Sequence, residues 1–320
     1  MPLDPRLVPL LEQFNALPQP TWTTAEERRE AVAQTPVAEQ IAALIAAPPA
    51  VARVWEERLP VARPADEISV RVYRPEQAEQ NPAGALLHIH GGGWWSGGLE
   101  DVDDRCRHLA DGAGIVVVSL DYRLAPEHPW PTAVHDALAA LHWMVAHAAR
   151  LGIGPDRIGV GGESAGANIA AALTLLTRDT NGPGLRMQLL EIPALDLTLS
   201  SPSMQTFGEG YVLTRDDLTW CVEQYAADHD VKDPLVSPLL APDLTGLPSA
   251  VIAAAEYDPL ADDARRYAER LRQAEVPCTQ TEYPGLVHGA HHMTALLPVA
   301  RQWQDDVVAA VRHHLNPHGR

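Results

Sequence analysis

The chain has 320 residues and carries a formal net charge of −18. That length suits one large α/β core with an insertion. Hydrophobic residues make up 46% of the chain and charged residues 21%, as in an ordinary globular protein. No apolar run approaches the roughly 20 residues of a membrane-spanning helix, and the negative charge opposes contact with DNA, RNA and anionic lipid. We therefore expect no membrane and no nucleic-acid partner.

Two features of the sequence predict a cytoplasmic protein. The first residues, Met1–Leu7, contain an aspartate and two prolines where a secretory signal peptide would be apolar. Cys106, Cys221 and Cys278 lie far apart and form no C-x-x-C pair, which argues against both a disulfide framework and a zinc site. We expect three buried thiols in a reducing compartment.

Residues 1–50 show helical patterning and predict an N-terminal helical cap segment. Thr24 and Glu27 have the spacing of a capping box at the start of a second helix. From Val54 the hydrophobic period changes to two, and Ile68–Val72 predicts a half-buried strand in an antiparallel meander. The apolar residues that share one face of the first helix are Leu7, Leu10, Leu11, Phe14 and Leu17.

Short apolar runs then alternate with helical patterns through residues 51–320. This rhythm predicts an α/β domain whose mostly parallel sheet has helices on both faces. The crossover between Ile192 and Ala250 is unusually long, and we interpret residues 198–228 as an insertion that joins the N-terminal helices in a small cap over the strand ends. The predicted buried strands are Ala85–His90, Ile115–Leu120, Arg157–Gly161, Met187–Ile192, Ala250–Ala255 and Cys278–Tyr283.

The pentapeptide Gly162–Gly166 has the pattern G-x-S-x-G between a predicted strand and a predicted helix, Ala165–Thr177. In that context the pattern is typical of a nucleophile elbow. The two glycines are needed because a side chain at either position would collide with the neighbouring strand or helix. Ser164 is therefore the predicted nucleophile, although the pentapeptide by itself is equally consistent with an ordinary glycine-rich turn.

A second glycine-rich segment, His90–Gly93, follows the predicted strand Ala85–His90. Acyl transfer builds negative charge on a carbonyl oxygen, and backbone N–H groups stabilise that charge only where no side chain blocks their approach. We expect the amides of Gly91, Gly92 and Gly93 to form an oxyanion hole together with the amide of Ala165, which follows the nucleophile. The alternative is a flexible glycine loop.

From about Val54 to the C-terminus, the chain resembles the hormone-sensitive-lipase family of microbial esterases. Besides the two glycine motifs, three further segments are typical of that family and occur in its order: Tyr122–Pro129, Glu256–Leu260 and Tyr283–Gly289. The resemblance implies the α/β-hydrolase fold, with a sheet of about eight strands. Glu163 stands where the family more often has Asp, and Ala290 where an aromatic residue is usual. Both differences could alter the shape of the pocket.

The triad acid can also be predicted without the family. An α/β-hydrolase needs a serine, then an acid, then a histidine in chain order. Asp258 directly follows a predicted strand, at the carboxyl edge of the sheet where ligands collect. Asp196, after the preceding strand, is its main rival. Asp262 and Asp263 are expected on the solvated face of the next helix.

His288 is the predicted general base, because it lies in a turn after the last predicted strand. His291 and His292 stand at i+3 and i+4 from it, a spacing that could bind a metal, as could His88 with His90 on a strand. No carboxylate or cysteine pattern completes either site in the sequence. We therefore expect no metal, and we expect His291 and His292 on a helix surface.

The residues of the substrate pocket are less sharply defined. Trp94 and Trp95 follow the glycine loop and are predicted either to line the pocket or to pack beside the loop. Glu163 and Tyr211 are further predicted pocket residues, and Trp220 could add bulk near the cap.

The triad and the resemblance together predict a serine carboxylesterase that hydrolyses short- to medium-chain acyl esters with water and needs no cofactor. One alternative is an amidase or carbamate hydrolase with the same triad. Another is a non-catalytic small-molecule receptor on the same fold, since plant gibberellin receptors resemble this family but have lost the triad histidine. The sequence leaves a homodimer open.

Overall fold

The computed structural model describes residues 2–16, 24–33, 43–61, 67–78 and 82–316. In these residues one sheet of eight strands runs through the molecule in the order β1-β2-β4-β3-β5-β6-β7-β8. The strands from β3 to β8 are parallel, whereas β2 runs antiparallel to both β1 and β4. The strands are β1 Arg53–Pro60, β2 Glu67–Arg74, β3 Ala83–Ile89, β4 Val116–Asp121, β5 Ile153–Glu163, β6 Met187–Glu191, β7 Ser249–Tyr257 and β8 Cys278–Val287.

The predicted α/β-hydrolase fold, with its mostly parallel sheet, is confirmed, although β5 and β8 are both longer than the predicted strands Arg157–Gly161 and Cys278–Tyr283. Strand β8 continues to Val287, four residues beyond the predicted end at Tyr283. Pro284 and Gly285 hid this continuation, because proline lacks an N–H donor and both residues weaken a strand pattern. They are tolerated here because β8 is an edge strand with one unpaired side. As a result, His288 follows immediately after a strand.

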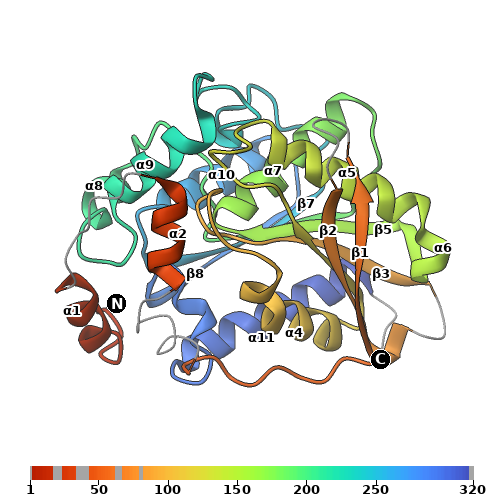
Figure 1. The fold of residues 1–320 in the computed structure, drawn as a ribbon, viewed down its shortest axis with the longest axis horizontal. Helices are drawn as coiled ribbons and strands as arrows, with labels where there is room; N and C mark the ends of the chain where they lie inside the picture. The colour runs from red at the N-terminus through yellow and green to blue at the C-terminus, as the bar shows by residue number, and fades with distance from the viewer. Residues whose placement is uncertain (1, 17–23, 34–42, 62–66, 79–81, 317–320) are drawn as a thin grey trace.

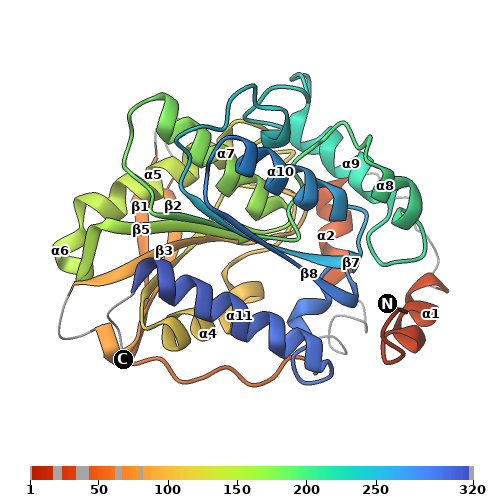
Figure 2. The ribbon, with the colours of Figure 1, turned by 180° about the vertical axis from the view of Figure 1, so that it is seen from behind.

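Helices cover both faces of the sheet (Figures 1 and 2). On one face lie α4 (Asp103–Ala113) and α11 (Pro298–Leu315), and on the other lie α5 (Thr132–Ala146), α7 (Ala165–Asp179) and α10 (Ala261–Gln273). A short helix, α6 (Ala148–Leu151), follows α5. Each face buries its own apolar cluster, so the core consists of two layers separated by the sheet.

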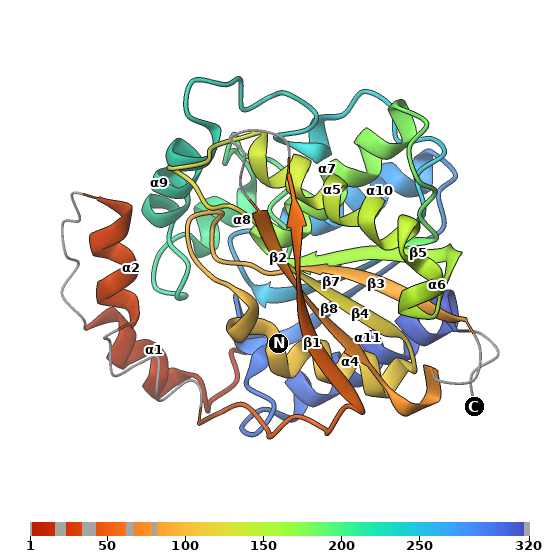
Figure 3. The same ribbon diagram turned by 45° about the vertical axis from the view of Figure 1, so that its right-hand side comes forward.

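The remaining helices gather at one end of the molecule (Figure 3). They are α1 (Val8–Asn15) and α2 (Ala25–Ala33) near the N-terminus, and α8 (Pro202–Phe207) and α9 (Arg215–Ala226) between β6 and β7. As predicted, Leu7 and Leu11 are buried and Thr24 caps α2, accepting a hydrogen bond of 3.2 Å from the amide of Glu27. Leu17 lies outside the described residues.

Two polar contacts join the N-terminal helices to the segment between β6 and β7. Arg28 of α2 forms an ion pair with Asp217 of α9. Asn15, at the end of α1, donates a hydrogen bond of 3.1 Å to the carbonyl of Gly210. The two segments are therefore in contact although about 200 residues separate them in the chain.

None of the helices in the described ranges combines the length and the apolar character that crossing a membrane requires.

Truncation of a central strand residue tests the two-layer core. Leu87 of β3 is fully buried, so Leu87→Ala removes packed methyl groups and leaves a cavity. We expect a loss of about 2–5 kcal/mol in the free energy of unfolding, measured by urea denaturation. The control Val8→Ala, at a side chain that is 39% exposed, should stay within about 0.5 kcal/mol of wild type. Equal losses at the two positions would contradict the assignment of the core.

Candidate active site

Ser164 lies in a strained turn between β5 and α7. Its backbone has φ 53° and ψ −117°, a left-handed conformation that a residue with a side chain rarely adopts. The flanking glycines allow this turn: a Cβ atom at Gly162 or Gly166 would lie 2.3 or 2.1 Å from the carbonyl oxygen of Ile89. The steric reason predicted for both glycines is confirmed. The Ser164 hydroxyl is thereby held at the carboxyl edge of the sheet.

The structure brings His288 and Asp258 to this serine. The Nε2 atom of His288 lies 3.1 Å from Ser164 Oγ, and its Nδ1 atom lies 2.8 Å from Asp258 Oδ2. Tyr257 and Val287 are paired across β7 and β8, so the residues that follow them leave the sheet side by side. The Asp258 side chain is only 1% exposed, and its other oxygen accepts a hydrogen bond of 2.8 Å from the amide of Leu260. This second bond fixes the carboxylate toward the imidazole.

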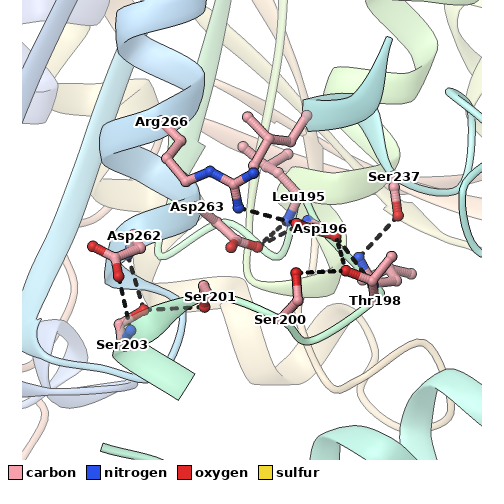
Figure 4. A network of polar contacts seen from close by, with 12 residues as sticks. Leu195, Asp196, Thr198, Ser200, Ser201, Ser203, Ser237, Asp262, Asp263 and Arg266 are labelled. Atoms are coloured by element: carbon pink, nitrogen blue, oxygen red, sulfur yellow. Dashed lines mark hydrogen bonds and ion pairs between the residues drawn. The ribbon is translucent and has the colours of Figure 1, made fainter. Parts of the chain in front are cut away.

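Asp196, the rival acid, is engaged elsewhere (Figure 4). Its carboxylate forms an ion pair of 3.0 Å with Arg266 and accepts a hydrogen bond of 2.6 Å from the hydroxyl of Thr198. The prediction of a solvated Asp263 is wrong: this side chain is buried and accepts hydrogen bonds from the amides of Leu195 and Asp196. Its position in the first turn of α10 faces the sheet, and burial raises its pKa to about 7.

Asp262 is likewise part of a packed contact and does not simply face solvent. It accepts a hydrogen bond of 2.7 Å from the amide of Ser203 at the start of α8, and it pairs with Arg265 (Figure 4 shows the contact with Ser203). The helix pattern did not reveal these contacts, because both acids meet a segment about 60 residues away in the chain.

The glycine loop after β3 lies beside the turn at Ser164. Gly92 and Gly93 have φ of +105° and +58°, and a Cβ atom at Gly92 would lie 2.2 Å from the carbonyl oxygen of Ser96. The carbonyl of Gly92 accepts hydrogen bonds from the amides of Trp95 and Ser96, which closes the loop into a tight turn. Within the described residues, the amides of Gly92 and Gly93 donate to no acceptor in the chain, so they are available to a ligand.

Trp94 and Trp95 are packed into the core beside this loop. Trp94 is 1% exposed and stacks on Tyr225 with ring centroids 4.6 Å apart. Trp95 is 6% exposed and meets Trp220 edge to face at 5.1 Å. Of the two roles predicted for these tryptophans, the contacts favour packing. They connect the glycine loop to α9 and leave little indole surface for a substrate.

An apolar cavity of about 880 Å³ opens next to His288. One wall comes from α1 and includes Leu10 and Phe14, and the opposite wall includes Val287 and Met293. Val212 also lines the cavity, whereas its neighbour Tyr211 packs against two other rings. The acidic residues at the rim are Glu100, Asp101, Asp103 and Asp104.

Tyr211 belongs to an aromatic cluster close to the acid of the triad. Its ring lies 5.4 Å from that of Phe207 and 5.5 Å from that of Tyr257, which directly precedes Asp258. All three rings are partly exposed, so the cluster forms a firm apolar surface between α8 and the end of β7. This places Tyr211 near the site through packing, although the sequence alone predicted it as a pocket residue without naming its contacts.

The structure gathers Glu163, His291 and His292 into what we call the Glu163 cluster. Oε2 of Glu163 lies 3.1 Å from Nε2 of His291 and 2.7 Å from Nε2 of His292. The prediction that both histidines lie on a helix surface is wrong. They lie in a 3-10 turn, Ala290–His292, and their side chains are 1% and 16% exposed. The i+3, i+4 spacing from His288 was the available signal, but the carboxylate comes from 128 residues away.

These three side chains have a donor set that could hold a divalent cation, and their ligand atoms lie within 4.8 Å of one another. The surroundings do not fit that role. A metal-bound histidine normally donates its second ring N–H to an acceptor, yet the buried Nδ1 of His291 has no partner among the described residues. If Nε2 of His291 instead donates its proton to Glu163, Nδ1 carries no hydrogen and is only an acceptor. Burying an unpaired acceptor costs less free energy than burying an unpaired N–H group. The three side chains therefore form a hydrogen-bonded cluster.

The other histidine pair that the sequence offered to a metal, His88 with His90, belongs to no group of three or more potential ligands among the described residues. His88 is fully buried in β3, and burial lowers its pKa to about 4. His90 stacks on Tyr122 with ring centroids 4.3 Å apart, and its Nδ1 lies 2.7 Å from the carbonyl oxygen of Gly91. His90 therefore supports the glycine loop from below.

Comparison with known proteins agrees with this geometry. The family described as alpha/beta hydrolase fold matches residues 86–292. Carboxylic ester hydrolase LipN of Mycobacterium tuberculosis is 42% identical over 265 residues, which are 81% of this chain and 70% of that protein. Ethyl acetate hydrolase of Pseudomonas putida is 38% identical over 253 residues, 78% of this chain and 79% of its own.

A solved structure extends the similarity to nearly the whole chain. The hyperthermophilic esterase from the archaeon Pyrobaculum calidifontis matches with a TM-score of 0.89 at 35% identity, covering 98% of this chain and 99% of that one. The family match spans the glycine loop, the turn at Ser164, Asp258 and His288. This chain belongs to the alpha/beta hydrolase fold family.

Proposed function

We propose that this protein is a serine carboxylesterase, one of the bacterial hormone-sensitive-lipase-like esterases within its family. The observation that carries the proposal is the chain of contacts from Ser164 Oγ through His288 to Asp258, at 3.1 and 2.8 Å. The relatives named above are ester hydrolases, which supports an ester as the substrate. A complete triad weighs against the receptor alternative, and the relatives' names weigh against the amidase alternative.

In the proposed reaction, His288 accepts the hydroxyl proton of Ser164 as Oγ attacks the ester carbonyl carbon. The amides of Gly92, Gly93 and Ala165 hold the resulting oxyanion, with Gly91 beginning the loop that carries them. The ester C–O bond then breaks, and His288 returns the proton to the leaving alcohol. A water molecule, deprotonated by His288, then attacks the acyl carbon; the bond to Oγ breaks, Ser164 recovers the proton from His288, and the acid is released. Asp258 orients the imidazole and stabilises its protonated form.

We further propose that α1, α2 and residues 198–228 form a cap over a domain of residues 51–320. Support comes from the contacts of Arg28 with Asp217 and of Asn15 with Gly210, which join the two parts. Because α1 lines the cavity beside His288, the cap would form part of the substrate pocket. A cytoplasmic location is supported by the three free cysteines, two of them buried. A homodimer stays a prediction.

Substitution of the nucleophile and the base tests the triad. Ser164→Ala and His288→Ala should each lower kcat on the order of 10⁴- to 10⁶-fold with a nitrophenyl ester, because triad residues act as one unit. The double variant should be little worse than either single one. His142→Ala, at an exposed histidine of α5, is the matched control and should keep wild-type activity. Losses that multiply in the double variant would contradict the assignment.

The acid is tested by comparing two aspartates of similar burial. Asp258→Asn should lower kcat about 10⁴-fold, because the amide favours the wrong imidazole tautomer. Asp196→Asn should keep kcat close to wild type, since Asp196 contacts Arg266 and Thr198 and has no contact with His288. Circular dichroism would verify that both variants fold. The opposite ranking would assign the acid to Asp196.

A series of nitrophenyl esters tests the substrate size. A cavity of about 880 Å³ shared between acyl and alcohol groups buries a few methylenes, each stabilised by about 0.8 kcal/mol, before its apolar wall ends. We expect kcat/KM to peak at acyl chains of about four to eight carbons, as the family resemblance implies, and to fall for longer chains. A rate that keeps rising to long chains, or activation at an oil–water interface, would show that the proposed cap does not limit the pocket.

A further inference from the structure

Glu163 lies beside three of the four segments that carry the proposed machinery: the turn at Ser164, the glycine loop and the turn after His288. Its backbone directly precedes Ser164. A Cβ atom built at Gly91 would lie 3.3 Å from Oε1 of Glu163, so the carboxylate lies immediately below the glycine loop. Its Oε2 contacts His291 and His292, three and four residues after His288.

The two histidines are themselves held firmly. His291 stacks on Trp303 of α11 with centroids 4.9 Å apart, and Trp303 in turn donates a hydrogen bond of 2.7 Å to Glu191. His292 lies against His291 at 4.2 Å and is the more exposed of the pair. The turn after His288 is therefore anchored at one end to α11 and at the other to the Glu163 carboxylate.

Charge explains why the anchor is an ion pair. Glu163 and Glu191 are paired in register on β5 and β6, so two buried carboxylates lie close together. Arg105 of α4 forms an ion pair with Glu191, which leaves Glu163 in need of a second cation. His292 is placed to supply it. Asp104 of α4 also attracts a proton to His292, whereas Arg105 opposes it.

The proton affinities agree with this arrangement. Burial acts to raise the pKa of Glu163, but the attraction of His292 and hydrogen bonds from both histidines hold that pKa well below its usual range. Burial acts to lower the pKa of His292, yet Glu163 raises that pKa above its ordinary value. Burial and the repulsion of His292 lower the pKa of His291, which is thus neutral beside the pair. Glu163 thus favours the charged form of His292, and the two side chains form an ion pair while His292 is protonated.

We propose that Glu163 and His292 are positioning residues, whose ion pair fixes the glycine loop and His288 relative to Ser164. This inference rests on the proposed esterase function and deepens it. His292 lines the cavity beside His288, and Glu163 lies beside Gly91; both act through the loops that carry them and exchange no proton with the substrate. Without the pair, a displacement of about 1 Å in a catalytic loop can lower the rate about 10²-fold. An unpaired Glu163 would also place an uncompensated negative charge next to a site that must bind an oxyanion.

The test uses Glu163→Gln, His292→Gln and the double variant. Glu163→Gln keeps the shape of the side chain but removes its charge. We expect each single variant to lower kcat about 10- to 100-fold, with KM changed less than about threefold. Because the two residues act as a pair, kcat of the double variant should be no lower than that of the less active single variant. His313→Gln, an exposed histidine near the end of α11, is the matched control and should match wild type.

The pH profile separates positioning from a general loss of structure. As pH rises through the raised pKa of His292, the pair loses its cation, so wild-type kcat should decline on the basic side. In His292→Gln this decline should disappear. In Glu163→Gln it should also disappear, because the variant has no carboxylate to pair with His292. His292 is 16% exposed, so this variant is expected to fold even if Glu163→Gln does not.

Three results would overturn the inference. One is wild-type kcat and an unchanged basic limb in folded His292→Gln. Another is a proportional loss of reactive serine in the variants, counted by nitrophenolate release from a nitrophenyl phosphonate, which would indicate unfolding as the cause. The third is loss of wild-type activity with a chelator and recovery with Zn²⁺, which would make the cluster a metal site. A wild-type protein that hydrolyses no ester would instead refute the proposed function itself.

Discussion

The close approach of the turn at Ser164 to the end of β3 is the constraint on which the rest of the site depends. Gly162 and Gly166 both face the carbonyl oxygen of Ile89 at distances that exclude any side chain. Because β3 and β5 are neighbours, this approach also places the start of the glycine loop beside the nucleophile. A side chain at either glycine would separate the two strand ends and displace Ser164 relative to the amides of the glycine loop.

The parallel sheet brings Asp258 and His288 to the same edge as Ser164. Neighbouring parallel strands end at one edge, so residues that follow β5, β7 and β8 arrive together without any long side chain. The register of β7 and β8, with Tyr257 opposite Val287, then sets Asp258 next to His288. Asp196 follows β6 at the same edge, yet a helix arginine and its own turn occupy its carboxylate. Local hydrogen bonding thus decides which aspartate is available.

Much of the fold and of the candidate site could be predicted from the sequence, because the patterns that determine them each span only a few residues. The glycines at 162 and 166, the order of serine, acid and histidine, and the two periods of hydrophobicity each lie within a single window of the chain. The end of β8 escaped prediction because Pro284 and Gly285 imitate a turn, although an edge strand tolerates them. Asp263, His291 and His292 were assigned to solvent because their partners lie about 70 to 130 residues away. Periodicity reports which face of an element is apolar, but not which polar group it meets.

The error over His291 and His292 has a physical basis. Histidine is intermediate in its tendency to be buried, and two in succession favour a polar, exposed interpretation. Here the elbow supplies a buried carboxylate, and β6 supplies a second one that Arg105 already neutralises.

Buried ion pairs such as the one between Glu163 and His292 seldom add stability, because desolvation offsets the attraction between the charges. The role of the Glu163 cluster is therefore to fix the positions of the neighbouring loops and to balance the buried charge, and not to stabilise the fold. This role links the two differences from the usual family pattern: Glu163 in place of Asp, and Ala290 in place of an aromatic residue. The longer carboxylate reaches the two histidines that follow the small, buried Ala290.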